Sequence, residues 1–303
     1  MTGSVLTIGK FDGVHRGHAF LLRQVAALAR DRGLKPVAMT FDPHPACVVA
    51  PSRAPLPLLS LEERIARIRE LGIEQVYVLN FTQEIANLTP EQFVSQYVCD
   101  ELHARVVIVG GNFRFGHRQA GDPAVLAQLG ARYGFETRLV DAVKLRGLIV
   151  STSEIRKRIG EGQVALAGRL LGRPYAIEGS VVSGLGIGSR QTVPTLNLQT
   201  SAAVLPCDGV YITRTQDLDD GRRWNSITNI GLRPTFDGHA RTIETFLLDP
   251  LNGASPRRMR LEFLRHVREE RKFASPEALK TQILRDVARA NVYFRRIQRW
   301  VAP

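Results

Sequence analysis

The stretch "FDGVHRGH", Phe11–His18, places two histidines three residues apart directly after a short apolar run. A strand, a glycine-bearing turn and a helix start together present free backbone N–H groups and the positive end of a helix dipole. Imidazoles at positions i and i+3 across that turn, those of His15 and His18, reach one phosphate group. The alternative is a loop whose histidines are merely exposed, and the spacing favours the phosphate site.

A second element of the same kind begins at Ser151. In "STSEIR" the hydroxyls of Ser151, Thr152 and Ser153 are consecutive and the basic Arg156 follows, a set that suits a triphosphate at a helix N-terminus. Ser151 and Glu154 also have the spacing of a helix capping box. Taken alone, the capping box is the favoured interpretation, and it is compatible with phosphate binding.

A third candidate is the glycine-rich loop "GGNFRFGHRQAGD", Gly110–Asp122, which carries Arg114 and Arg118. Loops of this composition that follow a buried strand often carry function. A long surface turn explains the same residues equally well, so the sequence leaves both interpretations open.

In the second half of the chain, "VPTLNL" places Thr195 and Asn197 two residues apart, on one side of an extended strand. A hydroxyl and an amide carbonyl are hard oxygen ligands that suit Mg²⁺ bound to nucleotide phosphates, although a plain barrel strand with a turn accounts for them too. Glu244, in "TIETFLLD", lies among apolar and β-branched neighbours. A strand carboxylate usually faces solvent, and service as a general base is the alternative hypothesis.

Composition limits the class of protein. With 303 residues, the chain is long enough for two domains, and 44% hydrophobic and 23% charged residues are typical of soluble globular proteins. A net charge of +12 indicates anionic partners: nucleotides, nucleic acid or a membrane surface. Three scattered cysteines predict a reducing compartment. Because no stretch approaches the roughly 20 apolar residues of a membrane span and no signal peptide is visible, we expect a cytoplasmic protein.

The elements that must position these residues alternate regularly in the first half. Apolar runs at 5–8, 37–41, 75–79 and 106–109 predict strands, and the intervening segments 18–32, 61–71 and 90–102 predict helices. This alternation predicts a doubly wound α/β domain in which ligands bind beyond the carboxyl ends of parallel strands. "FDGVHRGH", "FDPHP" (Phe41–Pro45) and "GGNFRFG" each follow a predicted strand, so we expect the three loops to share one crevice.

The pattern changes near "LLGRPY", Leu170–Tyr175, where we place the domain boundary, giving domains 1–172 and 173–303. Segments 175–182, 209–214, 223–230, 242–248 and 260–264 read as strands with Gly, Pro and Asp turns and no helices between them, which predicts an antiparallel β-barrel or sandwich. A helix from Pro276 to about Gln298, with Ser275 as its N-cap, closes the chain.

As a series, these motifs resemble those of one known family. The stretches "TIGKFDGVHRGH", "FDPHP", "VGGNFRFG", "STSEIR", "LLGRPY", "PTLNL", "NIGLRPTF" and "VREERKF" occur here in the order found in bacterial bifunctional riboflavin kinase/FMN adenylyltransferases, also called FAD synthetases. The resemblance covers residues 5 to about 288. It implies an N-terminal Rossmann-like nucleotidyltransferase domain that adenylylates FMN to FAD and a C-terminal β-barrel that phosphorylates riboflavin with ATP and Mg²⁺.

The resemblance also implies roles for individual residues. In the first domain the catalytic pair that contacts ATP phosphates is His15 and His18, and nucleotide or flavin is bound by Gly9, Phe11, His44, Asn112, Ser151, Thr152, Ser153 and Arg156. In the second domain Thr195 and Asn197 hold Mg-ATP, and Glu244 activates the ribityl hydroxyl of riboflavin. The implied small-molecule partners are ATP, riboflavin and FMN, with neither nucleic acid nor membrane among the partners.

The sequence departs from the family pattern in places. Lys10 and Gly111 stand where Asn and a polar residue are usual. The glycine-rich loop before "PTLN" reads "GSRQTVPT", with Ser189, Gln191 and Thr192 substituted. These departures define the alternative, a single-activity nucleotidyltransferase with a degenerate kinase domain. A second alternative, a basic RNA-binding barrel, agrees with the charge, but aromatics are only 7% and no aromatic–basic ladder is visible.

Overall fold

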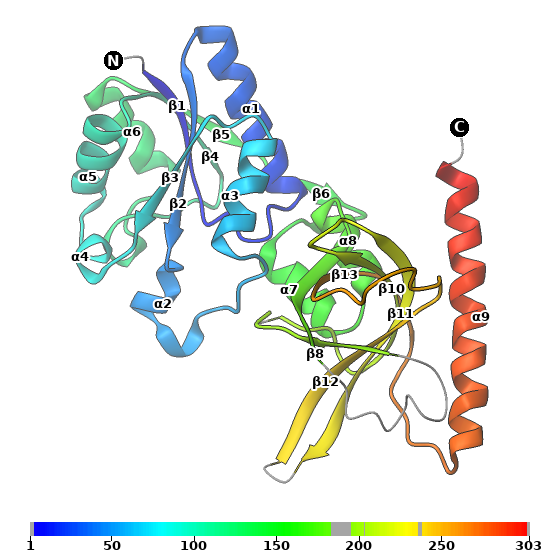
Figure 1. The fold of residues 1–303 in the computed structure, drawn as a ribbon. Helices are drawn as coiled ribbons and strands as arrows, with labels where there is room; N and C mark the ends of the chain where they lie inside the picture. Colours follow the sequence, from blue (N-terminus) through cyan, green and yellow to red (C-terminus); the bar gives the residue numbers. More distant parts are fainter. Residues whose placement is uncertain (1–2, 183–194, 203, 236–237, 302–303) are drawn as a thin grey trace. The chain divides into compact units, whose positions relative to one another are not determined.

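The computed structural model describes residues 3–182, 195–202, 204–235 and 238–301. The chain forms two compact units, residues 1–152 and 153–303 (Figure 1). This division lies twenty residues before the boundary expected from the sequence, because the helix after residue 152 is counted with the barrel. The assignment of residues 153–172 to the transferase domain therefore stays a prediction.

The first unit is built on a five-stranded parallel sheet in the order β3-β2-β1-β4-β5. The order reverses direction between β1 and β4, which makes that point the topological switch of the sheet. The strands are β1 (Ser4–Ile8), β2 (Lys35–Asp42), β3 (Gln75–Asn80), β4 (Ala104–Gly110) and β5 (Glu136–Val140).

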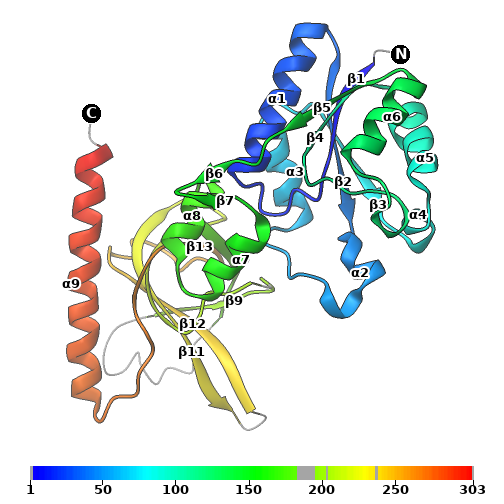
Figure 2. The same cartoon turned by 180° about the vertical axis from the view of Figure 1, so that it is seen from behind.

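Helices cover both faces of this sheet (Figures 1 and 2). Alternate residues of β1, β2 and β4 enter two separate cores, since side chains along a strand point to opposite faces. One core includes α1 (Arg16–Arg32) and α3 (Leu61–Glu70), and the other includes α5 (Pro90–Phe93), η2 (Val94–Glu101) and α6 (Pro123–Tyr133). The remaining elements are α2 (Pro45–Val49), η1 (Pro51–Arg53), α4 (Gln83–Ala86), η3 (His117–Gln119), β6 (Lys144–Leu145) and β7 (Leu148–Ile149).

The second unit is a closed barrel with the strand order β10-β11-β12-β9-β8-β13, antiparallel throughout. Its strands are β8 (Tyr175–Val182), β9 (Leu196–Gln199), β10 (Gly209–Asp217), β11 (Arg223–Thr235), β12 (Gly238–Leu247) and β13 (Arg258–Arg268). The helices are α7 (Thr152–Gly160), which spans the division between the units, α8 (Val164–Leu171), which contacts β8 and β13, and α9 (Pro276–Val301).

A ladder of buried hydroxyls lines the barrel interior. Thr228 on β11 lies opposite Thr245 on β12, and their Oγ1 atoms are 2.9 Å apart. Thr228 also shares a 2.8 Å hydrogen bond with Thr213 of β10, and all three side chains are fully buried. Because strand side chains alternate, Asn229 and Glu244, the neighbours of the Thr228–Thr245 pair, face the outside of the barrel.

The structure confirms the expected fold class, a Rossmann-like domain followed by an antiparallel barrel that ends in a helix. The sequence prediction did not include α6 or β5, and one predicted element differs in type. The segment expected as a helix over 90–102 is α-helical only to Phe93 and then continues as a π-helix, in which the N–H of Leu102 donates to the carbonyl of Tyr97 at 3.1 Å. Apolar periodicity does not separate these two helix types, because both bury one face.

Candidate active sites

The three expected ligand loops follow three neighbouring strands. "FDGVHRGH" follows β1, "FDPHP" begins at the end of β2, and "GGNFRFG" begins at the end of β4. In the sheet β1 lies between β2 and β4, and all three are parallel. Their carboxyl ends therefore lie at one edge of the sheet, where open α/β folds bind ligands.

His15 and His18 form a stacked pair at the start of α1. His15 is the N-cap residue, and its Nδ1 accepts a hydrogen bond from the backbone N–H of His18 at 3.2 Å. The two rings lie 3.7 Å apart, centroid to centroid, with planes inclined by only 14°. Since Nδ1 of His15 is an acceptor, the neutral imidazole carries its proton on Nε2 and presents a donor there.

The loop between β1 and α1 is held in a strained shape by its surroundings. Phe11 and Val14 have positive φ angles of 49° and 37°, which non-glycine residues rarely adopt. The buried Asp12 carboxylate accepts from the backbone N–H groups of Leu58 and Leu59, at 2.9 and 3.3 Å. The carboxylate thereby fixes the loop. A rigid loop preorganises the histidines that follow it.

Phe11 packs against the His18 ring from the protein interior, and Gly9 leaves room for the Phe11 ring. The Phe11 ring is 1% exposed and meets the His18 ring edge-on at 5.2 Å. A Cβ at Gly9 would lie 3.0 Å from the Phe11 ring, so a side chain there would displace the support of His18. The predicted contact of both residues with nucleotide or flavin stays a prediction.

His44 and Asn112 occupy the neighbouring loops. His44 caps α2, with its Nδ1 accepting from the N–H of Ala46 at 3.1 Å, which places its proton on Nε2 as in His15. Asn112 is exposed just beyond β4. Both lie at the ligand-binding edge of the sheet, and their roles there stay predictions.

The "STSEIR" segment forms the start of α7. Ser151 directly precedes the first helical residue, Thr152, whose Oγ1 donates to the carbonyl of Asp12 at 3.2 Å. This bond ties the segment to the histidine loop within the first unit. Ser153 and Arg156 are counted with the second unit, so their predicted part in phosphate binding stays a prediction.

The surroundings of the His18 side chain favour its neutral form. Its Nδ1 is buried and has no hydrogen-bond partner in the described part of the chain. Burial lowers the pKa of His18 well below 6.5, and the adjacent His15 imidazole lowers it further. At neutral pH His18 is therefore uncharged, with a proton to share through a hydrogen bond.

We expect His18 to titrate with a midpoint well below 6.5 in an NMR pH titration of labelled histidine side chains. Replacing the adjacent imidazole, in His15→Gln, removes the electrostatic contribution of His15 and should raise the His18 pKa while leaving the larger effect of burial in place. A wild-type midpoint at or above 6.5 would contradict the buried, stacked geometry.

The second candidate site is a row of polar side chains across three barrel strands. Glu244 on β12 lies directly opposite Asn197 on β9 and directly opposite Asn229 on β11. Residues opposite one another on antiparallel strands have Cβ atoms about 4.5–5.5 Å apart and point to the same face. Glu244 is half-buried there. The structure thus brings together the predicted Glu244 and Asn197.

Thr195 precedes β9 by one residue and is exposed. The substituted residues Ser189, Gln191 and Thr192 lie outside the described residues. The predicted Mg-ATP contact of Thr195 and Asn197 stays a prediction. Within the described residues no group of three or more His, Cys, Asp and Glu side chains could hold a metal ion.

Sequence reasoning missed Asn229 and Asp12 as site residues. Asn229 is the first residue of the stretch "NIGLRPTF", but nothing in a single sequence shows that it lies opposite Glu244 on the neighbouring strand. Asp12 lies inside "FDGVHRGH", and its bonds to Leu58 and Leu59 join segments 46 residues apart. Both positions depend on contacts between segments that are distant in the sequence, and local patterns do not report such contacts.

Comparison with known proteins places the chain. The FAD synthetase family matches residues 1–154, and the riboflavin kinase family matches residues 171–294. The bifunctional riboflavin kinase/FMN adenylyltransferase of Escherichia coli strain K12 is 35% identical over 96% of this chain and 93% of its own length. The chain belongs to the bifunctional riboflavin kinase/FMN adenylyltransferase family. Family members from Pseudomonas fluorescens and Bacillus subtilis are 37% and 32% identical, over 95% and 98% of the chain.

A crystal structure of a Streptococcus pneumoniae protein, described as a macrolide-efflux protein, is similar to this chain. The TM-score is 0.84 at 28% identity, covering 94% of this chain and 92% of that one. Among the described residues, no helix combines the length and apolar character needed to cross a membrane.

Proposed function

We propose that this chain converts riboflavin to FMN and FMN to FAD, at two separate sites that use different chemistry. The observation that carries the assignment is the difference between the two sites. In the histidine loop the only carboxylate, that of Asp12, accepts from the backbone N–H groups of Leu58 and Leu59, which leaves hydrogen-bond donors and no base to face a ligand. In the barrel a carboxylate, Glu244, stands between two amides.

Adenylyl transfer requires donors rather than a base. The phosphate of FMN is largely ionised at neutral pH, so one of its oxygens attacks the α-phosphorus of ATP while the bond to pyrophosphate breaks. Catalysis then consists of positioning and of stabilising the charge that develops. The Nε2–H of His15 and the neutral imidazole of His18 supply that stabilisation, beside the N-terminus of α1.

Phosphorylation of riboflavin requires a base, because the attacking group is a neutral hydroxyl. Glu244 accepts the proton of the ribityl hydroxyl as its oxygen attacks the γ-phosphorus of ATP and ADP departs. ATP enters as its magnesium complex. The Thr195 hydroxyl and the Asn197 amide oxygen suit that complex, since Mg²⁺ takes few protein ligands and keeps phosphate and water oxygens.

We also propose that Asn229 positions the Glu244 carboxylate. In this proposal the Asn229 side-chain amide donates to the carboxylate when the riboflavin hydroxyl is deprotonated, a bond worth about 1.5–3 kcal/mol with a charged acceptor. In Asn229→Leu, kcat for FMN formation should therefore fall by about tenfold to a hundredfold. KM for Mg-ATP should stay close to the wild-type value, because the proposed bond orients the base and not the nucleotide. Steady-state kinetics of FMN formation measure both quantities.

Asn225→Leu is the matched control for Asn229→Leu. Asn225 lies on the same strand and the same face, but four residues along β11 from Asn229, the residue opposite Glu244. The Asn225→Leu variant should leave both kcat and KM unchanged. An Asn229→Leu variant that keeps the wild-type kcat, or that raises KM for Mg-ATP as much as it lowers kcat, would overturn the positioning proposal.

Two half-reaction assays test the proposed function. Supplied with riboflavin, ATP and Mg²⁺, the protein should release ADP and form FMN; supplied with FMN, ATP and Mg²⁺, it should form FAD and pyrophosphate. FAD formation with no FMN formation from riboflavin would instead establish the degenerate-kinase alternative. A cytoplasmic location and the absence of nucleic-acid or membrane partners stay predictions.

A further inference from the structure

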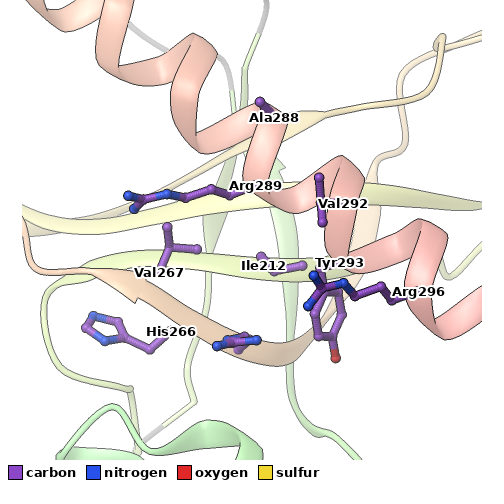
Figure 3. Close-up of a pocket in the computed structure, with 9 residues that line it drawn as sticks. Ile212, His266, Val267, Ala288, Arg289, Val292, Tyr293 and Arg296 are labelled. Carbon is purple, nitrogen blue, oxygen red and sulfur yellow. The ribbon is translucent and has the colours of Figure 1, made fainter.

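A pocket of about 470 Å³ lies between α9 and the outer face of strands β10 and β13 (Figure 3). Its floor is apolar: Ile212 of β10, Val267 of β13 and Val292 of α9. Figure 3 shows Val292 and Tyr293 projecting from α9 toward Ile212. No residue of β9 or β12 lines it, so the pocket is distinct from the row that contains Glu244.

Three arginines line the same pocket and no acidic residue does. Arg265 lies directly opposite Ile212 on the neighbouring strand and therefore shares its face. Arg289 and Arg296 are seven residues apart on α9, two helical turns, and so lie on one side of the helix.

These guanidinium groups have no ion pair or hydrogen bond within the part of the chain that the structure describes. Other arginines nearby behave differently: Arg268, on the same strand as Arg265, donates to Asp286 at 2.8 Å, and Arg260 pairs with Glu178 at 2.5 Å. The protein thus leaves the charge of the pocket arginines uncompensated, whereas Arg260 and Arg268 of β13 are paired with carboxylates.

Contacts within the protein fasten α9 to the barrel and so form the pocket without a ligand. Ala290 and Phe294 of α9 are buried against Ile212. The buried Asp286 accepts from Arg268 and, at 2.8 Å, from Gln282, which anchors the helix to the end of β13. A preformed concave site costs little ordering free energy on binding.

We propose that this pocket binds a phosphorylated aromatic small molecule. The planar guanidinium fork matches phosphate oxygens two at a time, and three such groups favour a ligand with more than one negative charge. The apolar floor and the Tyr293 ring favour a flat, weakly polar body, and the volume falls within the roughly 300–1,000 Å³ of small-molecule sites. FMN, FAD and ADP belong to this class. Their identification as natural occupants rests on the proposed function, whereas the site itself does not.

Cysteine protection in the full-length protein tests the proposal. In Val292→Cys, whose parent side chain is 41% exposed at the pocket, N-ethylmaleimide labelling is followed peptide by peptide by mass spectrometry with FMN, ADP or inorganic pyrophosphate added. At a concentration ten times the Kd, labelling should slow about tenfold, because only unoccupied protein reacts. FMN should protect at lower concentration than pyrophosphate, which cannot cover the apolar floor.

Two controls separate this site from the catalytic ones. Leu284→Cys, 60% exposed on the same helix, should label at the same rate with and without ligand. Adding Arg265→Gln, Arg289→Gln and Arg296→Gln to Val292→Cys should abolish protection, whereas adding Arg285→Gln and Arg295→Gln, two exposed α9 arginines outside the pocket, should preserve it.

Absence of protection by all three probes would overturn the proposal, as would protection that survives the loss of the three pocket arginines, since it would then be transmitted from elsewhere. Both half-reactions should persist in the triple arginine variant. A protein that shows protection at Val292→Cys but neither half-reaction would refute the proposed function and leave the anion pocket standing.

Discussion

The His18→Ala variant should form FAD from FMN and ATP at least about a hundredfold more slowly than the wild type, by analogy with the loss of a single donor from an oxyanion hole. Its riboflavin kinase rate should be unchanged, because Glu244 and its neighbours belong to the barrel. The effect should appear in kcat, since the donor acts on charge that develops in the transition state. Coupled detection of pyrophosphate release measures it.

His18 is the sharper position to change because His15 has two roles. His15 caps α1 through its Nδ1, and loss of an N-cap typically costs about 1 kcal/mol of stability, so His15→Ala mixes a folding effect with a catalytic one. His18 contributes its ring alone. His103→Ala, just before β4 at the opposite end of the strands, serves as the matched control and should retain FAD synthesis. Equal loss of both activities in His18→Ala would mean that the residue supports folding instead.

The Glu244→Gln variant should lose FMN formation by about 10²- to 10⁴-fold, the usual contribution of general base catalysis. Glutamine keeps the size and the hydrogen-bonding capacity of the side chain next to Asn197 and Asn229, so ATP binding should survive. FAD formation from supplied FMN should be unaffected. Product separation by chromatography, together with an ATP titration, measures all three quantities.

Two further variants define what the Glu244 result means. Thr195→Ala should raise KM for Mg-ATP in the kinase reaction more than it lowers kcat, because it removes a ligand of the nucleotide complex rather than the base. Glu262→Gln removes a carboxylate from β13, on the far side of the barrel order from β12, and should leave the kinase rate intact. If Glu244→Gln kept wild-type kinase turnover, Glu244 would not be the general base.

Local patterns predicted four of the five strands of the parallel sheet and the helix α1, but not β5 or α6. The strand–loop–helix series around "FDGVHRGH" follows from an apolar run, glycines and a periodic helix, all within about thirty residues. The shared edge of the three loops also followed, since parallel strands place their carboxyl ends together. The order of the strands did not, because which strands are neighbours depends on contacts between distant segments.

The kinase row shows where sequence reasoning stops. That Glu244 and Asn197 meet face to face depends on the register of β9 against β12, and a shift of one residue would turn one of them to the other face. Asn229 joins them only because β11 pairs with β12. The stacking of His15 on His18 could not be predicted from their spacing either. A separation of three residues allows contact, but the hydrogen bond from the His18 N–H to Nδ1 of His15 holds the two rings nearly parallel.

The most direct test of two independent sites on one chain is a mixture of the two inactivated proteins. Supplied with riboflavin, ATP and Mg²⁺, His18→Ala alone should accumulate FMN, and Glu244→Gln alone should make neither FMN nor FAD at an appreciable rate. Mixed together, they should make FAD, because FMN released by the first is adenylylated by the second. Failure of the mixture to make FAD, when each variant retains its other half-reaction, would contradict the division of the two chemistries between the histidine loop and the barrel.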